Sequence, residues 1–100
     1  MQRIELDGAS WQTELDFYEA LAAALGSVKW HGRNANAFEE TMIYYLDLNE
    51  VQPPYELIIR NTREPMLSFV ITFASWIASA REDRQRDWGS DVEVLVTVLS

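Results

Sequence analysis

The sequence alternates between short segments with strand character and longer segments with helical periodicity, and this alternation restricts the possible folds more than any other feature. Residues 3–6 alternate polar and apolar side chains, residues 55–60 are largely apolar, and residues 92–99 are rich in β-branched side chains. These patterns predict three strands. Strands separated by helices favour a parallel sheet, because parallel strands need long crossover connections. The predicted fold is α/β, a three-stranded parallel sheet covered by helices in the order β-α-α-β-α-β. Whether residues 55–60 or 92–99 form the central strand stays open.

Three helices are predicted between these strands. Ser10 is a suitable N-cap for the first helix and Gly26 a suitable end. Asn34 can cap the second helix, over residues 34–46, and Asn61 or Thr62 the third, from residue 66 to about residue 85. The expected core side chains of the three helices are Trp11, Leu15, Tyr18, Leu21, Ala22 and Leu25, then Phe38, Thr41, Met42, Tyr45 and Leu46, and finally Trp76. The opposite face of the second helix would carry Asn36, Glu39, Glu40, Ile43 and Tyr44.

Size and charge narrow the functional classes. With 100 residues, the chain suits one domain spanning residues 1–100. It contains no cysteine, which excludes disulfides and thiolate metal sites and fits a reducing cytoplasm. No signal peptide or membrane span is expected, because no apolar run approaches the length of about 20 residues that a span requires. The net charge of −8 opposes direct nucleic-acid binding and favours a basic protein partner.

The segment of residues 25–40 carries a specific motif. It resembles the central segment of the barstar family, which has the form aromatic-aromatic-Gly-x-Asn-x-Asp-Ala-apolar-x-Asp after a first helix. The residues that match this form are Trp30, His31, Gly32, Asn34, Asn36, Ala37, Phe38 and Glu40. Pro54 followed by residues 55–60, and the ending over residues 95–100, resemble the family's second and last strands. The resemblance therefore extends over the whole chain in order and spacing.

The resemblance implies a compact α/β inhibitor that blocks the active site of a secreted bacterial ribonuclease, in an immunity or antitoxin role. The implied binding surface is the loop of residues 27–33 together with the outer face of the helix over residues 34–46. Its candidate contacts are Trp30, His31, Gly32, Arg33, Asn34, Asn36, Glu39, Glu40, Ile43 and Tyr44. In the family the last helix also lends an acid to the interface, for which Glu82 and Asp83 are candidates.

Three departures from the family pattern bear on the partner. Asn36 stands where the family has its first helix acid, Glu40 is one methylene longer than the second, and Glu39 replaces an aromatic residue. Lys29 and Arg33 add two positive charges. The formal charges of Lys29, Arg33, Glu39 and Glu40 therefore sum to zero. A strongly cationic site is complemented by a negative surface. This sum predicts weak inhibition of barnase, the family's best-known target, unless Glu39 and Glu40 alone point into the site.

Several motif residues have structural interpretations beside the functional ones. Trp30 is either a hot spot or folded back onto the core. Asn34 suits a helix cap better than a contact, and Gly32 suits a turn with positive φ. His31 is the only histidine, which is weak support for catalysis and insufficient for a histidine-rich metal site.

Two other functions stay open at this stage. His31, Arg33 and Glu40 could supply an acid, a base and a phosphate clamp for RNA cleavage. The chain could instead be a regulatory interaction module without a ribonuclease target, or provide immunity to a different kind of toxin. The preferred prediction is a non-enzymatic cytoplasmic inhibitor that is monomeric when free, binds a secreted or delivered toxin, and uses no cofactor, metal, nucleic acid or membrane.

Overall fold

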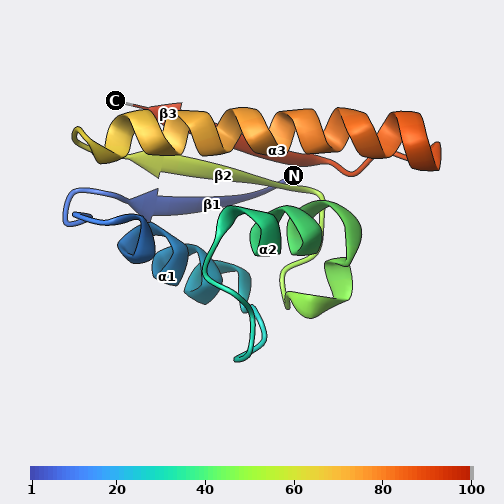
Figure 1. The fold of residues 1–100 in the computed structure, drawn as a ribbon, viewed down its shortest axis with the longest axis horizontal. Helices are drawn as coiled ribbons and strands as arrows, with labels where there is room; N and C mark the ends of the chain where they lie inside the picture. Colours follow the sequence, from blue (N-terminus) through green and yellow to red (C-terminus); the bar gives the residue numbers. More distant parts are fainter. Residues whose placement is uncertain (100) are drawn as a thin grey trace.

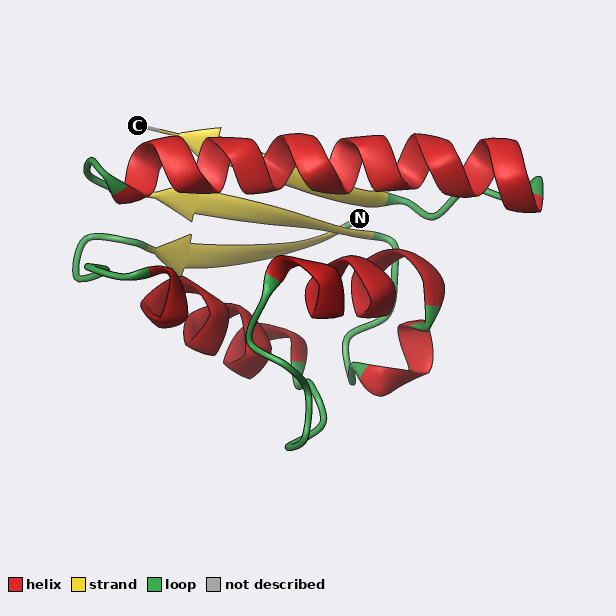
Figure 2. Cartoon of the chain, in the orientation of Figure 1, coloured by secondary structure: helices red, strands yellow, loops and turns green. Residues whose placement is uncertain are grey.

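The computed structural model describes residues 1–99, so Ser100 lies outside the described residues (Figures 1 and 2). The elements are β1 (Gln2–Asp7), α1 (Glu14–Leu25), α2 (Ala35–Glu39), the π-helical turn η1 (Glu40–Tyr44), the 3₁₀ turn η2 (Leu46–Leu48), β2 (Tyr55–Arg60), α3 (Met66–Trp88) and β3 (Val94–Leu99). The predicted α/β class and the order β-α-α-β-α-β are confirmed.

The sheet is parallel, with the strand order β1-β2-β3. The central strand is therefore β2, which settles the question that the sequence patterns left open. Ile4 pairs with Leu57 and Leu57 with Val96, so apolar side chains align across one face of all three strands. On the other face Arg3 pairs with Glu56, and Arg60 pairs with Glu5 at 3.2 Å. The helices thus cover one face of the sheet, and the other face carries these charged side chains beside Ile58, Leu95 and Leu99.

One continuous core joins this apolar sheet face to all three helices. Leu57 and Ile59 of β2 are fully buried under the helices. Above them a cluster of aromatic rings connects the helices, with Phe17 of α1 and Phe73 of α3 having ring centroids 4.9 Å apart. Tyr18 of α1 stacks on Phe38 of α2 at 5.6 Å. These contacts fix α2, which carries the candidate site, against α1 and α3.

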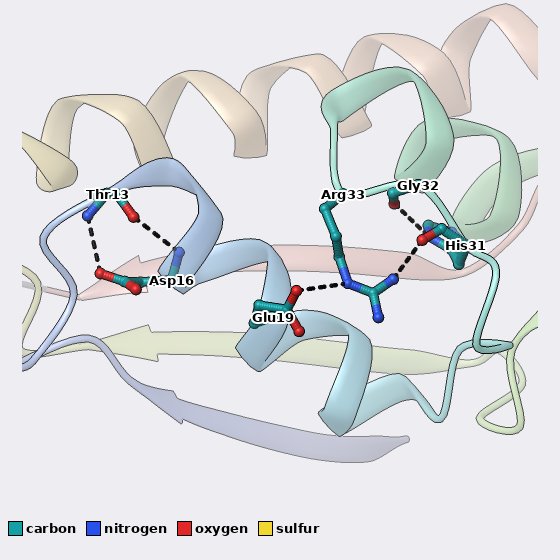
Figure 3. A network of polar contacts seen from close by, with 6 residues as sticks. All are labelled: Thr13, Asp16, Glu19, His31, Gly32 and Arg33. Atoms are coloured by element: carbon teal, nitrogen blue, oxygen red, sulfur yellow. Dashed lines mark hydrogen bonds and ion pairs between the residues drawn. The ribbon is translucent and has the colours of Figure 1, made fainter.

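Helix α1 begins three residues later than the position that Ser10 would cap. Its N-cap is Thr13, whose hydroxyl accepts a hydrogen bond from the Asp16 N–H while the Asp16 carboxylate accepts one from the Thr13 N–H (Figure 3). This capping box satisfies two free backbone donors, more than Ser10 alone could satisfy. Leu15 is exposed rather than part of the core. The predicted end is confirmed, because Gly26 adopts a left-handed conformation with φ 64°.

The second predicted helix is α-helical only over its first half. After Glu39 the chain widens into η1, in which the Tyr45 N–H donates to the Glu40 carbonyl at 2.6 Å. A π turn holds more residues than an α turn and rotates the side chains that follow it. Ile43, expected on the outer face, is therefore fully buried, and Tyr45, expected in the core, is exposed.

Helix α3 differs from its prediction at both ends and at one tryptophan. It follows Pro65 rather than an Asn61 or Thr62 cap, and it continues to Trp88, where Gly89 ends it with φ 70°. The buried positions of α3 are Met66, Val70, Phe73, Ile77 and Ala80. Trp76 falls beside this stripe and is 44% exposed, so its assignment to the core was wrong.

Candidate partner-binding surface

The loop before α2 is fixed by hydrogen bonds to a distant segment. The Val28 N–H donates to the Leu48 carbonyl at 3.1 Å, and the Ser27 hydroxyl donates to the Asn49 side chain at 2.6 Å. The Glu50 N–H donates to the Gly26 carbonyl at 3.1 Å. A loop held in this way loses little conformational entropy when it binds a partner.

His31 holds the loop from inside the fold. Only 5% of the residue is exposed, and its ring lies 4.3 Å from the ring of Phe38. Nδ1 lies 2.6 Å from the Gly32 carbonyl, and Nε2 lies 2.8 Å from the Thr41 hydroxyl. Burial and two hydrogen bonds thus occupy the ring in the free protein, and a contact of His31 with a partner stays a prediction.

Gly32 has a steric role that the sequence does not reveal. Its φ is not positive, since Gly26 and Gly89 are the glycines with positive φ among residues 1–99. A Cβ at this position would lie 2.9 Å from the Asn34 amide nitrogen and 3.2 Å from the Ala37 Cβ. The expected left-handed turn is therefore wrong, and the glycine instead allows the loop to pass close to the start of α2.

Asn34 and Trp30 lie at the two ends of this loop-to-helix junction. The Asn34 side chain accepts a hydrogen bond from the Ala37 N–H at 2.9 Å, which confirms it as the N-cap of α2. Trp30 is 74% exposed, so the possibility that it folds back onto the core is excluded. A large exposed indole on a fixed loop is a typical feature of a binding surface.

The two basic loop residues point away from the acids of the helix. Arg33 contacts Glu19 of α1 at 3.3 Å and donates to the His31 carbonyl at 2.6 Å (Figure 3). Lys29 lines a separate hollow with Asp47 and Glu50. The possible catalytic set of His31, Arg33 and Glu40 does not converge, because His31 is buried and Arg33 is bound to α1.

A groove of about 500 Å³ gathers the central part of the candidate site. Four of its six lining residues were predicted, namely Asn36, Glu39, Glu40 and Tyr44, and the other two are Tyr45 and Trp88. Its two charged residues are both acids, so the lining carries a charge of −2. The formal charge of zero, summed over the loop and the helix, does not apply to this groove. The expectation of weak barnase inhibition therefore loses its basis.

The end of α3 forms one wall of the groove. Trp88 packs edge-on against Tyr44 with ring centroids 5.0 Å apart, and the Arg84 guanidinium lies 5.0 Å from the centre of the Trp88 ring. Arg84 also donates to the Ile43 carbonyl, which ties α3 to the π turn. Burial raises the pKa of the Tyr44 phenol, and the nearby carboxylates of Asp83, Glu39 and Asp87 raise it further. The Arg84 guanidinium lowers the pKa of this phenol and offsets part of the effect of the three acids.

The structure also separates the two candidate acids on α3. Asp83 is close enough to act on Tyr44, whereas Glu82 lines a different groove beside β3. Part of the Asp83 charge is offset by Arg86, 2.9 Å away. Asp83 is thus the acid on the side of α3 that faces the candidate site.

Tyr45 and Trp88 were missed for identifiable reasons. The π turn that exposes Tyr45 has no signature in the apolar pattern, and Trp88 lies beyond residue 85, near which the third helix was predicted to end. The signal available in the sequence was that both residues are aromatic, a residue type common at binding surfaces. No group of three or more potential metal ligands occurs among residues 1–99, and none of the helices described there has the length and apolarity to span a membrane.

The fold and this surface define a small α/β binding protein, with an acidic, aromatic groove and an exposed tryptophan on one helical side. The family model described as Barstar (barnase inhibitor) matches residues 1–100. The chain therefore belongs to the barstar family, a family of inhibitors rather than enzymes. A search of curated proteins finds no match to the chain.

Proposed function

We propose that this protein binds and occludes the active site of a cytotoxic bacterial ribonuclease, and that it has no catalytic activity of its own. The observation that carries the proposal is the groove lined by Glu39 and Glu40, with no basic side chain in its lining. A ribonuclease active site binds phosphate with cationic side chains. A carboxylate that replaces the phosphate can accept several charge-assisted hydrogen bonds there.

The proposed contact surface consists of the groove together with Trp30 and the backbone around Gly32. Glu40 is exposed, while its neighbours Thr41 and Met42 are buried. The packed π turn therefore fixes the backbone that carries Glu40, which reduces the entropy lost on binding. Tyr44, Tyr45 and Trp88 supply flat apolar surface next to the acids. Aromatic groups flanking an anion suit a site that holds a base next to a phosphate.

The proposed setting is the cytoplasm of a bacterium that secretes or delivers the toxin. An inhibitor there would neutralise ribonuclease molecules before export or after entry. The charge of −8 supports a basic partner, because opposite fields raise the association rate. The partner would thus be recognised first by long-range attraction and then by the groove.

The test compares Glu40→Gln with Glu14→Gln, a matched change on an exposed acid of α1. The partner is the basic protein that a tagged chain captures from its native host, and RNA cleavage by that protein is measured with and without the chain. Glu40→Gln should weaken binding by about 2–5 kcal/mol, because it leaves the partner's charges unpaired. Glu14→Gln should change it by less than about 0.5 kcal/mol.

Two outcomes contradict the proposal. Unchanged calorimetric affinity of folded Glu40→Gln would remove the groove as the binding site. A captured partner without ribonuclease activity would instead favour the alternative of a regulatory module or of immunity to another toxin. Glu19 is unsuitable as a control, because it contacts Arg33 beside the binding loop.

A further inference from the structure

The two edges of the sheet differ in charge. The edge strand β1 carries Arg3, Glu5 and Asp7, whereas the edge strand β3 has the sequence Val-Leu-Val-Thr-Val-Leu without any charged residue. Proteins commonly protect an open sheet edge with charges, prolines or bulges, because unpaired backbone groups invite another strand. The edge of β1 has such protection and that of β3 lacks it.

The backbone of β3 offers hydrogen-bonding groups on its outer side. The Tyr55 N–H donates to the Glu93 carbonyl at 3.0 Å. Because successive residues of a strand in a parallel sheet direct their backbone groups alternately to the two sides, those of Val96 and Val98 point away from β2. No strand lies on that side among residues 1–99.

The side chains around this edge are apolar or small beside Ala74 and Ala78, and polar beside Arg81, Glu82, Gln85 and Asp91. Between α3 and β3 lies a groove of about 320 Å³, whose lining includes Ala74, Ala78, Leu95 and Val96. Next to it Ile71 is 52% exposed, and Leu95 is 40% exposed. At one end of the groove Arg81 holds Asp91 through two hydrogen bonds of 2.7 and 2.8 Å, which neutralises both charges.

We propose that β3 pairs with β3 of a second copy of this chain, antiparallel about a twofold axis, in place of the free monomer expected from the sequence. A twofold contact requires a surface that is complementary to itself. The strand β3 meets this requirement, because it has no charged side chain that would repel the same side chain of the second copy. In antiparallel pairing the outward-facing residues oppose one another, so that Val96 meets Val96 or Val98 and every free backbone group of the edge is used. Two three-stranded sheets become one continuous sheet.

The flank of α3 next to β3 also favours a second copy of the chain as the partner. The twofold axis that joins the strands also brings the two α3 helices side by side. Ala74 and Ala78 permit their close approach, and Ile71 gains an apolar neighbour. A free extended peptide would pair with the strand but would leave this helix flank uncovered, which favours a second copy of the chain.

The dimer leaves the proposed ribonuclease-binding groove open. The two grooves share no lining residue. The dimer would therefore bind two partner molecules. Each copy carries a charge of −8, and this repulsion opposes association until salt screens it. Dimerisation is thus expected to strengthen as the salt concentration rises.

The test is sedimentation equilibrium of the full chain from micromolar to near-millimolar concentration, at low and elevated salt. The wild type should form a dimer, and Leu95→Lys should lower the association constant about tenfold or more, because it removes apolar contact and charges the edge. Leu15→Lys is the matched control, since Leu15 is also exposed but lies on α1. It should leave the association constant unchanged.

Amide exchange of the wild-type chain, followed by NMR, supplies a second measurement that needs no variant. The Val96 and Val98 amides should become protected as concentration rises, while amides that bond to β2 are protected throughout. A chain that stays monomeric in elevated salt would overturn the proposal. So would a dimer that leaves these two amides exchanging freely, or protection that arises only when the ribonuclease is added.

Discussion

Replacing His31 with alanine tests the arrangement that holds the binding loop against α2. The ring lies 2.8 Å from the Thr41 hydroxyl, 2.6 Å from the Gly32 carbonyl and 4.3 Å from the ring of Phe38. It thus joins the loop that exposes Trp30 to the turn that carries Glu40. His31→Ala should therefore reduce the free energy of unfolding strongly.

The magnitude follows from these contacts. Thr41 is buried, and leaving its hydroxyl unpaired costs about 1–3 kcal/mol. The lost ring contact with Phe38 adds about 0.5–1.5 kcal/mol. The Gly32 carbonyl belongs to an exposed residue, so water can replace its partner at little cost. The total is about 2–4 kcal/mol, which leaves a typical domain folded but lowers its Tm by roughly 10–25 °C.

The assay is urea unfolding followed by tryptophan fluorescence, extended to a double-mutant cycle with His31→Phe and Thr41→Val. Each single change leaves one buried polar group without its partner, whereas the double change removes both. The two effects should therefore be non-additive by about 1 kcal/mol or more. Additive effects, or a loss below about 1 kcal/mol for His31→Ala, would refute the buried hydrogen bond.

Two further predictions concern the surface. Trp30→Ala should change the free energy of unfolding by less than about 0.5 kcal/mol, because the side chain is exposed, yet weaken binding to the ribonuclease by about 2 kcal/mol or more as measured by calorimetry; a large drop in Tm would contradict this placement. The hydrogen bonds from Arg81 lower the pKa of the Asp91 carboxyl, so their stabilising effect is complete above the unfolded-state pKa and disappears as pH falls through the folded-state pKa. Asp91→Asn should then destabilise the protein near neutral pH and lose less stability than the wild type on acidification, as urea unfolding across a pH series can show; parallel pH profiles would exclude this contribution.

The sequence was sufficient for the three strands and for the start of α2, because these features depend on strong local signals, though it was not sufficient for the strand order. The strand β2 has the predicted bounds, and Gly26 and Asn34 act as the predicted helix end and cap. The start of α1 was missed because two residues, Ser10 and Thr13, could both act as caps. Only Thr13 has an acid at the position that completes the capping box.

The candidate site was predictable in its residues but not in their orientation. Asn36, Glu39, Glu40 and Tyr44 line one groove as expected. The burial of Ile43 accompanies the π turn, in which the Ile43 carbonyl accepts a hydrogen bond from Arg84. The burial of His31 depends on Thr41, ten residues away along the chain. Neither contact is visible in local periodicity.

The charge of the groove illustrates how the fold converts a mixed sequence into a polarised surface. Arg33 is bound by Glu19 of α1, Lys29 lies in another hollow, and Arg84 lies over the ring of Trp88 while donating to the Ile43 carbonyl. Lys29 and Arg33 therefore lie outside the groove lining. Arg84 lies within the wall that supports the groove. The two acids are left as the charged groups available to a partner. Substitutions that release Arg33 would then act on binding through electrostatics as well as through the shape of the loop.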